Sequence, residues 1–314
     1  MRVGIDIGGT KIVMGLVDES GAVLARERFL TQKDRGYEDV VSRVIQGVEG
    51  MIQRQGVALG GPLTRIGCAS AGQIDPKTGR IFFSPNLSWR DVPLKEDLTA
   101  GLKGPVLVEN DVNAATYGEW RFGLKGGPRH AVGIFIGTGI GGGLILDGRL
   151  YRGFSGVAAE LGHITLNPLG YRCNCGNRGC FEAYCGGSYV VRRVQSRLNE
   201  GYRGKLWDII EGDIEGLNTG HIEAAWMAGD DLCRKVWDEV ILYFGLALQS
   251  IANLLNPEVI ICGGGVVNGA KNLLGEAVGV MDKIVMPASR DGLRVEKATR
   301  GDDATILGVS FIED

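Results

Sequence analysis

The stretch Asp6-Ile7-Gly8-Gly9-Thr10-Lys11 decides the fold, because a related stretch returns later in the chain. Val3 to Asp18 aligns with Val132 to Asp147, and each segment is an apolar run, a glycine turn and a second apolar run ending in Asp. Such turns lack Cβ atoms and present backbone N–H groups, so they can wrap an anion closely. We therefore expect one device used twice, with the two turns holding a polyphosphate between them.

Side chains in the two turns favour phosphate binding over plain hairpins. Glycine pairs also form ordinary hairpin turns, and that alternative stays open for either turn alone. A plain hairpin, however, does not need the cation of Lys11 or the hydroxyl groups of Thr10 and Thr138. The residues expected to bind the nucleotide cofactor are Asp6, Gly8, Gly9, Thr10 and Lys11 in the first stretch, and Gly137, Thr138 and Gly139 in the second.

Length and composition predict an α/β protein of two domains. A chain of 314 residues exceeds the usual size of one core, and a cleft between two domains is the default ligand site. We expect a smaller domain over residues 1–112, a larger one over 113–301, and a C-terminal helix over 302–314 that returns to the first. A hydrophobic fraction of 44% with 23% charged residues is ordinary for a globular protein.

Charge and hydropathy argue against nucleic-acid and membrane partners. The net charge is −3 with a pI near 5.8, and no basic run interleaves with aromatic residues. We also expect no membrane span, because no apolar stretch approaches ~20 residues. The first strand starts at Arg2, which leaves no room for a signal peptide. These features predict a cytoplasmic protein.

Periodicity places the motifs on a coarse map of strands and helices. The residues 263–265 follow a buried strand and precede a helix, so Gly263, Gly264 and Gly265 are a further candidate for nucleotide contact, with a simple β-to-α turn as the alternative. The expected strands are 3–7, 12–17, 23–30, 66–71, 106–109 and 259–262, with a second meander from 132, and the expected helices are 37–54, 94–102, 111–122, 230–255 and 271–281.

One histidine and three cysteines have the spacing of a zinc site. His163, Cys173, Cys175 and Cys180 form a His-x9-Cys-x-Cys-x4-Cys array, and three thiolates with one imidazole suit a closed tetrahedral site of structural type. Seven cysteines without a secretion signal disfavour a disulfide framework. Unconnected reduced thiols are the alternative, and Cys185 could compete as a ligand from outside the compact array.

Two carboxylates flank this array. Glu160 stands three residues before His163, and Glu182 stands two after Cys180. Carboxylates accept directional hydrogen bonds from hydroxyl groups, so the pair could hold a sugar near the metal. A solvated surface acid is the alternative for each.

The run Glu109-Asn110-Asp111 supplies a candidate general base. Transfer of a phosphoryl group to an alcohol needs a carboxylate beside the attacking hydroxyl, and Asp111 is our candidate. Its other reading, an N-cap for the helix toward Phe122, is compatible with that role.

Together these motifs resemble the ROK sugar kinases, a family named for repressors, open reading frames and kinases. The zinc-loop pattern is highly specific, whereas the glycine turns are shared with the wider actin, hexokinase and Hsp70 superfamily. The match spans nearly the whole chain and rests on Asp6 to Lys11, Glu109 to Asp111, Gly137 to Gly143, Glu160 to His163 and Cys173 to Glu182.

The resemblance implies a two-domain ribonuclease H-like fold with an interdomain cleft, ATP and Mg²⁺ as cofactors beside structural Zn²⁺, and transfer to a hexose hydroxyl, usually at carbon 6. The most similar members are the ROK glucokinases, and the family favours homodimers and homotetramers. Where many relatives carry a Pro before the glycine, this chain has Ser70-Ala71-Gly72. By similarity the catalytic base is Asp111, the turn above the sugar contains Ser70 and Gly72, the sugar loop is Ser84 to Trp89, and the sugar is held by Asn86, Asn110, Glu160, His163 and Glu182.

Several functions stay open within this resemblance. Kinases for glucose, N-acetylmannosamine, N-acetylglucosamine, mannose and fructose share every motif above, and glucose is our first expectation. A DNA-binding repressor is disfavoured because only Met1 and Arg2 precede the first strand. A non-catalytic sugar sensor is the alternative of another class. Intact Lys11, Asp111 and Thr138 argue against it, since sugar binding alone needs no phosphate turns.

Overall fold

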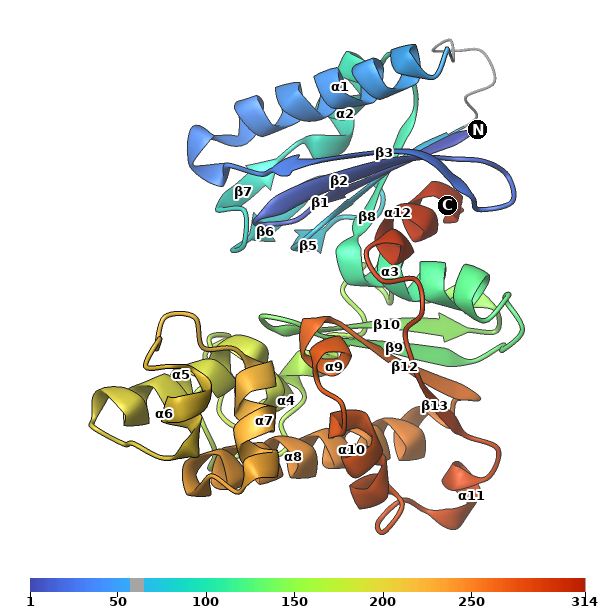
Figure 1. Ribbon diagram of the computed structural model, residues 1–314. Coiled ribbons are helices and arrows are strands. Elements are labelled where there is room, and N and C mark those ends of the chain that lie inside the picture. Colours follow the sequence, from blue (N-terminus) through green and yellow to red (C-terminus); the bar gives the residue numbers. More distant parts are fainter. Residues whose placement is uncertain (57–64, 314) are drawn as a thin grey trace. The chain divides into compact units, whose positions relative to one another are not determined.

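The chain folds into two compact units in the computed structural model, which describes residues 1–56 and 65–313 (Figure 1). Unit 1 comprises Met1–Arg129, Gly143–Ala159 and Thr299–Asp314. Unit 2 comprises His130–Gly142 and Glu160–Ala298. The chain therefore passes between the units several times, and each unit collects segments that are distant in the sequence.

A five-stranded sheet with the order β3-β2-β1-β4-β8 forms the centre of unit 1. β1, β2 and β3 are the predicted antiparallel meander, and β4 and β8 extend the sheet in parallel with β1. The observed ends lie within one residue of the predicted ones. The strands are β1 (Arg2–Ile7), β2 (Lys11–Val17), β3 (Val23–Leu30), β4 (Arg65–Ser70) and β8 (Val106–Asn110).

The strand register brings three chain segments to one edge of this sheet. Ile7 pairs with Ser70 across β1 and β4, and Ser70 pairs with Asn110 across β4 and β8. Because the three strands are parallel, the residues that follow each strand emerge at the same edge. That edge therefore holds the first glycine turn, the turn after Ser70, and Asp111.

Helices cover both faces of the unit 1 sheet (Figure 1). α1 (Tyr37–Arg54) and α2 (Leu94–Leu102) cover one face and end where the periodicity predicts. The fully buried Val40, Val44 and Val48 recur at every fourth position of α1, and each such burial stabilises the fold by roughly 1.5–3 kcal/mol.

α3 (Asp111–Gly118) and α12 (Asp303–Phe311) cover the other face and touch closely through glycines. A Cβ on Gly118 would lie 1.9 Å from the carbonyl oxygen of Ala304, and one on Gly308 would lie 1.8 Å from that of Ala114. No larger residue fits at either position. The contact fixes the helix that begins at Asp111 against the C-terminal helix.

The predicted helix over 111–122 is not a single α-helix. α3 ends at Gly118 and continues as a π-helical segment, η2 (Glu119–Gly123), in which the buried Glu119 accepts hydrogen bonds from Thr299 N and Arg300 N. Unit 1 also contains the short helix η1 (Lys33–Arg35) and a three-stranded antiparallel sheet of β5 (Gln73–Ile74), β6 (Ile81–Ser84) and β7 (Trp89–Val92).

A second five-stranded sheet has the order β11-β10-β9-β12-β13. It contains the predicted second meander, and β12 lies parallel to β9 and to β13. Its strands are β9 (Ala131–Ile136), β10 (Ile140–Leu146), β11 (Arg149–Leu150), β12 (Val259–Gly263) and β13 (Arg294–Lys297).

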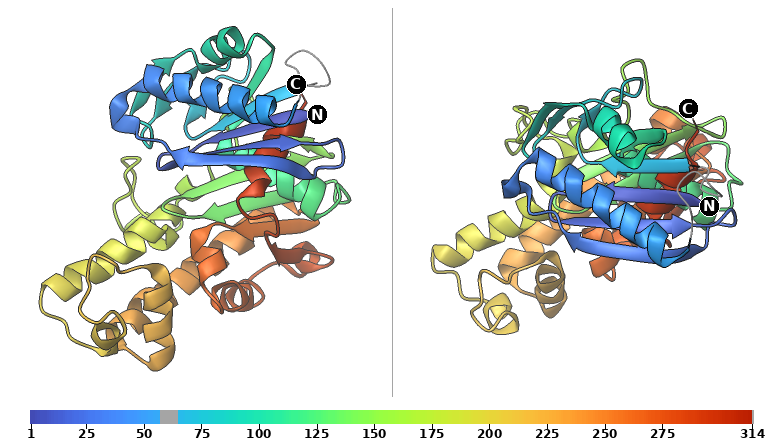
Figure 2. Two further views of the ribbon diagram at one scale, coloured as in Figure 1. Left: turned by 45° about the horizontal axis from the view of Figure 1, so that its top comes forward. Right: turned by 90° about the horizontal axis from the view of Figure 1, so that it is seen from above.

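Unit 2 is built around one long helix, α8 (Asp231–Leu255), which the periodicity predicts and which Asp230 caps. The other helices of the unit gather around α8 or border the sheet, and those between residues 187 and 228 form a group of their own (Figure 2). They are η3 (Leu161–His163), α4 (Phe181–Cys185), α5 (Gly187–Asn199), α6 (Lys205–Ile209), α7 (Thr219–Ala228), α9 (Gly265–Gly269), α10 (Leu273–Met281) and α11 (Pro287–Arg290).

Two predictions for unit 2 need correction. The helix expected at 271–281 begins at Leu273, and a separate helix, α9, starts earlier at Gly265. α8 is also long and apolar enough to span a membrane, although no such stretch was expected. Its buried residues, which include Trp237 and Phe244, pack against neighbouring helices, as the residues of a core helix do.

Candidate functional site

The first glycine turn, Gly8-Gly9-Thr10, joins β1 to β2 in unit 1. The Thr31 hydroxyl donates to Gly8 O at 2.6 Å, and Thr31 N donates to Thr10 O at 2.9 Å. Gly8 N donates within the turn to Lys11 O. Among the described residues, the N–H groups of Gly9 and Thr10 have no hydrogen-bond acceptor. The turn thus presents two N–H donors, as an anion site requires.

Charged side chains surround this turn. Lys11 Nζ lies 2.6 Å from Asp302 Oδ2, at the start of the C-terminal helix, and this partner was missed because the two residues are distant in the sequence. Lys11 holds the pKa of Asp302 below its usual range. Burial raises the pKa of Asp6 to about 7, and the negative charges of Asp111 and Asp302 act in the same direction while Lys11 opposes them. The edge therefore brings the carboxylates of Asp6, Asp111 and Asp302 close to Lys11.

The two acids of Glu109-Asn110-Asp111 have different surroundings in the structure. Glu109 is 5% exposed, lies 2.6 Å from Arg152 Nε, and accepts from Asn113 Nδ2 at 3.0 Å. The Glu109 carboxylate is therefore engaged by two side chains of its own unit. Asp111 is half-buried and begins α3. The sequence contained no signal for Arg152.

Asn110 caps α3, so the alternative reading of Asp111 as the N-cap is wrong. Asn110 Oδ1 accepts from Val112 N at 2.9 Å and from Asn113 N at 3.1 Å. Its Nδ2 donates to Gly72 O at 3.2 Å. The cap thereby ties the helix that begins at Asp111 to the turn after β4.

The other predicted sugar residues of unit 1 lie around the same edge. Ser70 is fully buried at the end of β4. Gly72 has a φ of 126°, and a Cβ there would lie 2.7 Å from Phe83 O, so only glycine fits. Asn86 lies against Gly9, because a Cβ on Gly9 would be 2.9 Å from Asn86 O. Unit 1 thus brings together its predicted site residues.

The second glycine turn, Gly137-Thr138-Gly139, joins β9 to β10. Its carbonyls accept from the start of α5: Gly187 N donates to Gly137 O at 2.8 Å, and Ser188 N donates to Thr138 O at 3.1 Å. Within the described chain, the N–H groups of Thr138 and Gly139 have no acceptor. The same pattern of engaged carbonyls and available N–H groups therefore occurs in both turns.

Glu182 and Gly264 border the second turn within unit 2. Glu182 Oε2 accepts from Ile140 N at 2.8 Å, and a Cβ on Gly139 would lie 2.4 Å from the same oxygen. Gly264 has a φ of 89°, and a Cβ there would be 2.4 Å from Ile136 O, directly before the turn. Gly263 pairs with Phe135 across β12 and β9, and Gly265 is exposed. The predicted nucleotide glycines of unit 2 are thus neighbours.

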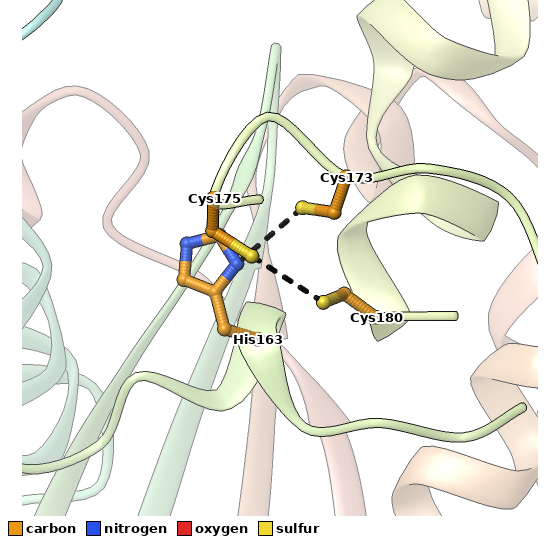
Figure 3. Close-up of side chains that lie close together, drawn as sticks. All are labelled: His163, Cys173, Cys175 and Cys180. Carbon is orange, nitrogen blue, oxygen red and sulfur yellow. Dashed lines mark hydrogen bonds between the residues drawn. The ribbon is translucent and has the colours of Figure 1, made fainter. Parts of the chain in front are cut away.

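The four predicted zinc ligands converge (Figure 3). Their ligand atoms all lie within 4.8 Å of one another, with Cys173 Sγ 3.7 Å from His163 Nδ1 and Cys175 Sγ 3.6 Å from Cys180 Sγ. A tetrahedron with Zn–S bonds of about 2.3 Å has edges of about 3.8 Å, so the spacing fits zinc.

Residues adjoining this cluster differ in their surroundings. Cys185 is fully buried and donates to Val240 O at 3.3 Å, which places it outside the cluster. Glu160 is exposed, and its carbonyl accepts from His163 N at 3.0 Å. His163 turns Nδ1 toward Cys173.

Known proteins resemble this chain over nearly its whole length. The chain is 37% identical over 267 residues to a glucokinase of Streptomyces coelicolor, covering 84% of the chain and 82% of that protein. It is 34% identical to a glucokinase of Thermotoga maritima, covering 99% and 96%. The crystal structure of a ROK family glucokinase from Streptomyces griseus in complex with glucose and AMPPNP matches with a TM-score of 0.82 and 34% identity, covering 98% and 97%.

Repressors occur among the relatives as well. A xylose repressor of Bacillus spizizenii is 31% identical over 311 residues, which cover 99% of this chain and 76% of that protein. The structural likeness confirms the predicted ribonuclease H-like fold of the actin, hexokinase and Hsp70 superfamily. Residues 2–313 match the sequence model of the ROK family, so the chain belongs to the ROK family.

Proposed function

We propose that the protein transfers the γ-phosphoryl group of ATP to the 6-hydroxyl of a hexose, with glucose as the preferred acceptor. The observation that carries this proposal is the edge of unit 1, where the register Ile7, Ser70, Asn110 brings Asp111 to the glycine turn. Support also comes from the glucokinases at 34–37% identity.

In the proposed reaction Asp111 is the general base. It accepts the proton of the sugar hydroxyl while the hydroxyl oxygen forms a bond to the γ-phosphorus. The bond from that phosphorus to the bridging oxygen then breaks, and ADP leaves. The ion pair between Glu109 and Arg152 and the Asn110 cap keep α3 in place during the transfer.

The two glycine turns and Lys11 are proposed to bind the phosphates. Their available N–H groups and the Lys11 ammonium supply positive charge where charge develops in the transition state. The carboxylates of Asp6 and Asp111 fit a Mg²⁺ ion: burial is the main cause that raises the pKa of Asp6 to about 7, the negative charge of Asp111 adds to it, and a cation would offset both. When bound with ATP, Mg²⁺ neutralises charge on the β- and γ-phosphates.

Each unit contributes residues proposed to bind the sugar, and the zinc cluster is proposed to hold the loop that presents those of unit 2. His163 Nδ1 points to the cluster, which leaves Nε2 as the ring atom to contact a sugar hydroxyl. In unit 1 these residues are Ser70, Gly72, Asn86, Asn110 and Asp111, and in unit 2 they are Glu160, His163 and Glu182.

ADP release measured over a panel of glucose, mannose, fructose, N-acetylglucosamine and N-acetylmannosamine tests this proposal. We expect the highest kcat/KM with glucose and no ADP release above background without sugar. A different best sugar would correct the acceptor but retain the kinase. Sugar binding without ADP release would instead favour a sensor, the second candidate, which the 31% identity to a xylose repressor supports.

A further inference from the structure

A groove in unit 2 lies beside the zinc loop and has no part in the site described above. It has a volume of about 530 Å³ and lies between one face of α5 and the start of α8. Tyr171 and Arg172, from the loop that carries Cys173, line one end of it. We call this the arginine groove.

Four arginines line the arginine groove, and two of them lack an acidic partner. Arg193 lies 2.6 Å from a Glu239 carboxylate oxygen, and Arg197 lies 2.7 Å from one of Glu200. Within the described ranges 1–56 and 65–313, Arg172 and Arg192 form no ion pair with a carboxylate. The groove therefore carries about two uncompensated positive charges.

The spacing along α5 explains why three of the four arginines lie on one side of the groove. One face of α5 carries Tyr189 and the residues three, four, seven and eight positions after it. These are Arg192, Arg193, Ser196 and Arg197. The Arg192 guanidinium lies 4.7 Å from the centroid of the Tyr189 ring, and its Nε donates to Ser188 O. No carboxylate of the described residues accepts a hydrogen bond from the remaining guanidinium N–H groups of Arg192.

The rest of the groove lining is apolar and aromatic. Leu232 and Val236 contribute aliphatic surface above the buried Ala183, and Tyr171, which is 42% exposed, adds aromatic surface. An anion alone would leave this surface in water, whereas an anion with an apolar or ring-shaped body would cover it.

We propose that the arginine groove binds a phosphate monoester whose body is a ring or an apolar group. A phosphate monoester carries nearly two negative charges at neutral pH, which matches the two unpaired guanidinium groups. Arginine also presents paired N–H donors that fit phosphate oxygens in a bidentate way. Carboxylates carry a single charge and match the groove less well.

Tyr189 connects the arginine groove to the zinc cluster. The Tyr189 hydroxyl lies 3.7 Å from Cys173 Sγ and accepts from Asn174 N at 2.8 Å. A ligand that orders Arg192 and Tyr189 therefore restrains the loop that carries the metal ligands. Binding should slow hydrogen exchange at the Asn174 amide.

Calorimetric titration of the full chain with phenyl phosphate tests the proposal. This probe joins a ring to a phosphate dianion, while inorganic phosphate carries only the charge and phenol only the ring. We expect saturable binding of phenyl phosphate, with inorganic phosphate and phenol each about tenfold weaker. Equal binding of inorganic phosphate would show an adventitious anion contact and overturn the proposal.

Substitutions locate the binding. Arg172→Gln and Arg192→Gln should each weaken phenyl phosphate about tenfold, because each removes a charged hydrogen-bond partner. Arg178→Gln is the matched control: Arg178 is exposed in the same loop, donates to Gly170 O, and lies outside the groove lining. Binding that survives both groove substitutions occurs elsewhere, and hydrogen exchange at Asn174 that ignores the ligand would refute the link to the zinc loop. None of these measurements depends on kinase activity.

Discussion

The two glycine turns have the same backbone arrangement but different chemical surroundings. In both, three residues join two strands, neighbouring groups engage the carbonyls, and two successive N–H groups have no acceptor among the described residues. The donors to the carbonyls differ: Thr31 of the meander serves the first turn, and the start of α5 serves the second.

Side chains make the turns distinct. The first turn has Lys11 and a group of carboxylates, including Asp6 and Asp302. The second has no cation in the corresponding segment, and its close neighbour is the carboxylate of Glu182. The same backbone arrangement therefore stands in two different charge environments. We infer that chemistry and charge belong to the first turn and that the second contributes backbone contacts.

The largest expected effect concerns Asp111, which belongs to the edge of the first turn. Asp111→Asn keeps a hydrogen-bonding side chain but removes the proposed base, so kcat for ADP release should fall by about 10² to 10⁴ with little change in sugar KM. Asp147→Asn, at an exposed carboxylate after the second turn, is the control and should leave kcat unchanged. A near wild-type kcat for Asp111→Asn would show that Asp111, at the edge of the first turn, is not the general base.

The next effect concerns the zinc cluster, which lies in the unit of the second turn. Cys175→Ser removes one of four ligands, and we expect zinc affinity to fall at least about 100-fold, with weaker sugar binding. Elemental analysis should find one zinc per wild-type chain. Cys185→Ala, outside the cluster, should retain the metal. A wild-type protein that carries no zinc and is fully active would end this account of the loop.

The inferred difference in charge between the turns is tested by a pair of substitutions. Lys11→Met should weaken ATP about 30-fold, because a charge-assisted contact to phosphate is lost. Thr138→Val removes only a neutral hydroxyl and should weaken ATP about threefold. Titration of a non-hydrolysable ATP analogue measures both affinities. Similar losses in the two variants would contradict the division of roles.

The raised pKa of Asp6, beside the first turn, predicts that the free energy of unfolding depends on pH. Its folded pKa of about 7 exceeds the ordinary value of 3.8, so the folded state holds the proton more tightly than the unfolded state. The stabilisation is complete below pH 3.8 and is lost as the pH rises through about 7. Between these two pH values the free energy of unfolding of the wild type should fall by about 2 kcal/mol, and Asp6→Asn should abolish this fall. The figure is half of what the full pKa shift corresponds to, because Asp6 keeps some solvent contact. Urea melts of ligand-free protein at several pH values measure it, and parallel wild-type and variant profiles would exclude the effect.

The sequence predicted the local features of this fold well because they depend on neighbours in the chain. The meander, α1, α2 and α8 follow from hydrophobic periods, and the zinc array follows from spacing within one loop. The π-helical turn at Glu119 did not follow, because it is set by hydrogen bonds to Thr299 and Arg300, far along the chain.

Partners brought together by tertiary structure were likewise beyond the sequence. Asp302 reaches Lys11 because α12 returns to β1, and Arg152 reaches Glu109 from a loop without a recognisable pattern. The sequence did not distinguish Asn110 from Asp111 as the helix cap either, since both residue types cap helices. The structure resolved that choice through two hydrogen bonds to Asn110.

We propose that the second turn binds nucleotide phosphate, as the first does, and Gly137→Val tests this proposal most directly. A Cβ on Gly137 would meet no heavy atom within 4 Å, whereas one on Gly8 would lie 3.0 Å from Lys11 O. The substitution at Gly137 should therefore spare the fold while obstructing approach to the turn. Calorimetric titration should show a non-hydrolysable ATP analogue weakened at least about tenfold, with glucose affinity and Tm unchanged. Unchanged affinity for the analogue, or equal losses for both ligands with a lowered Tm, would show that the second turn is a plain hairpin.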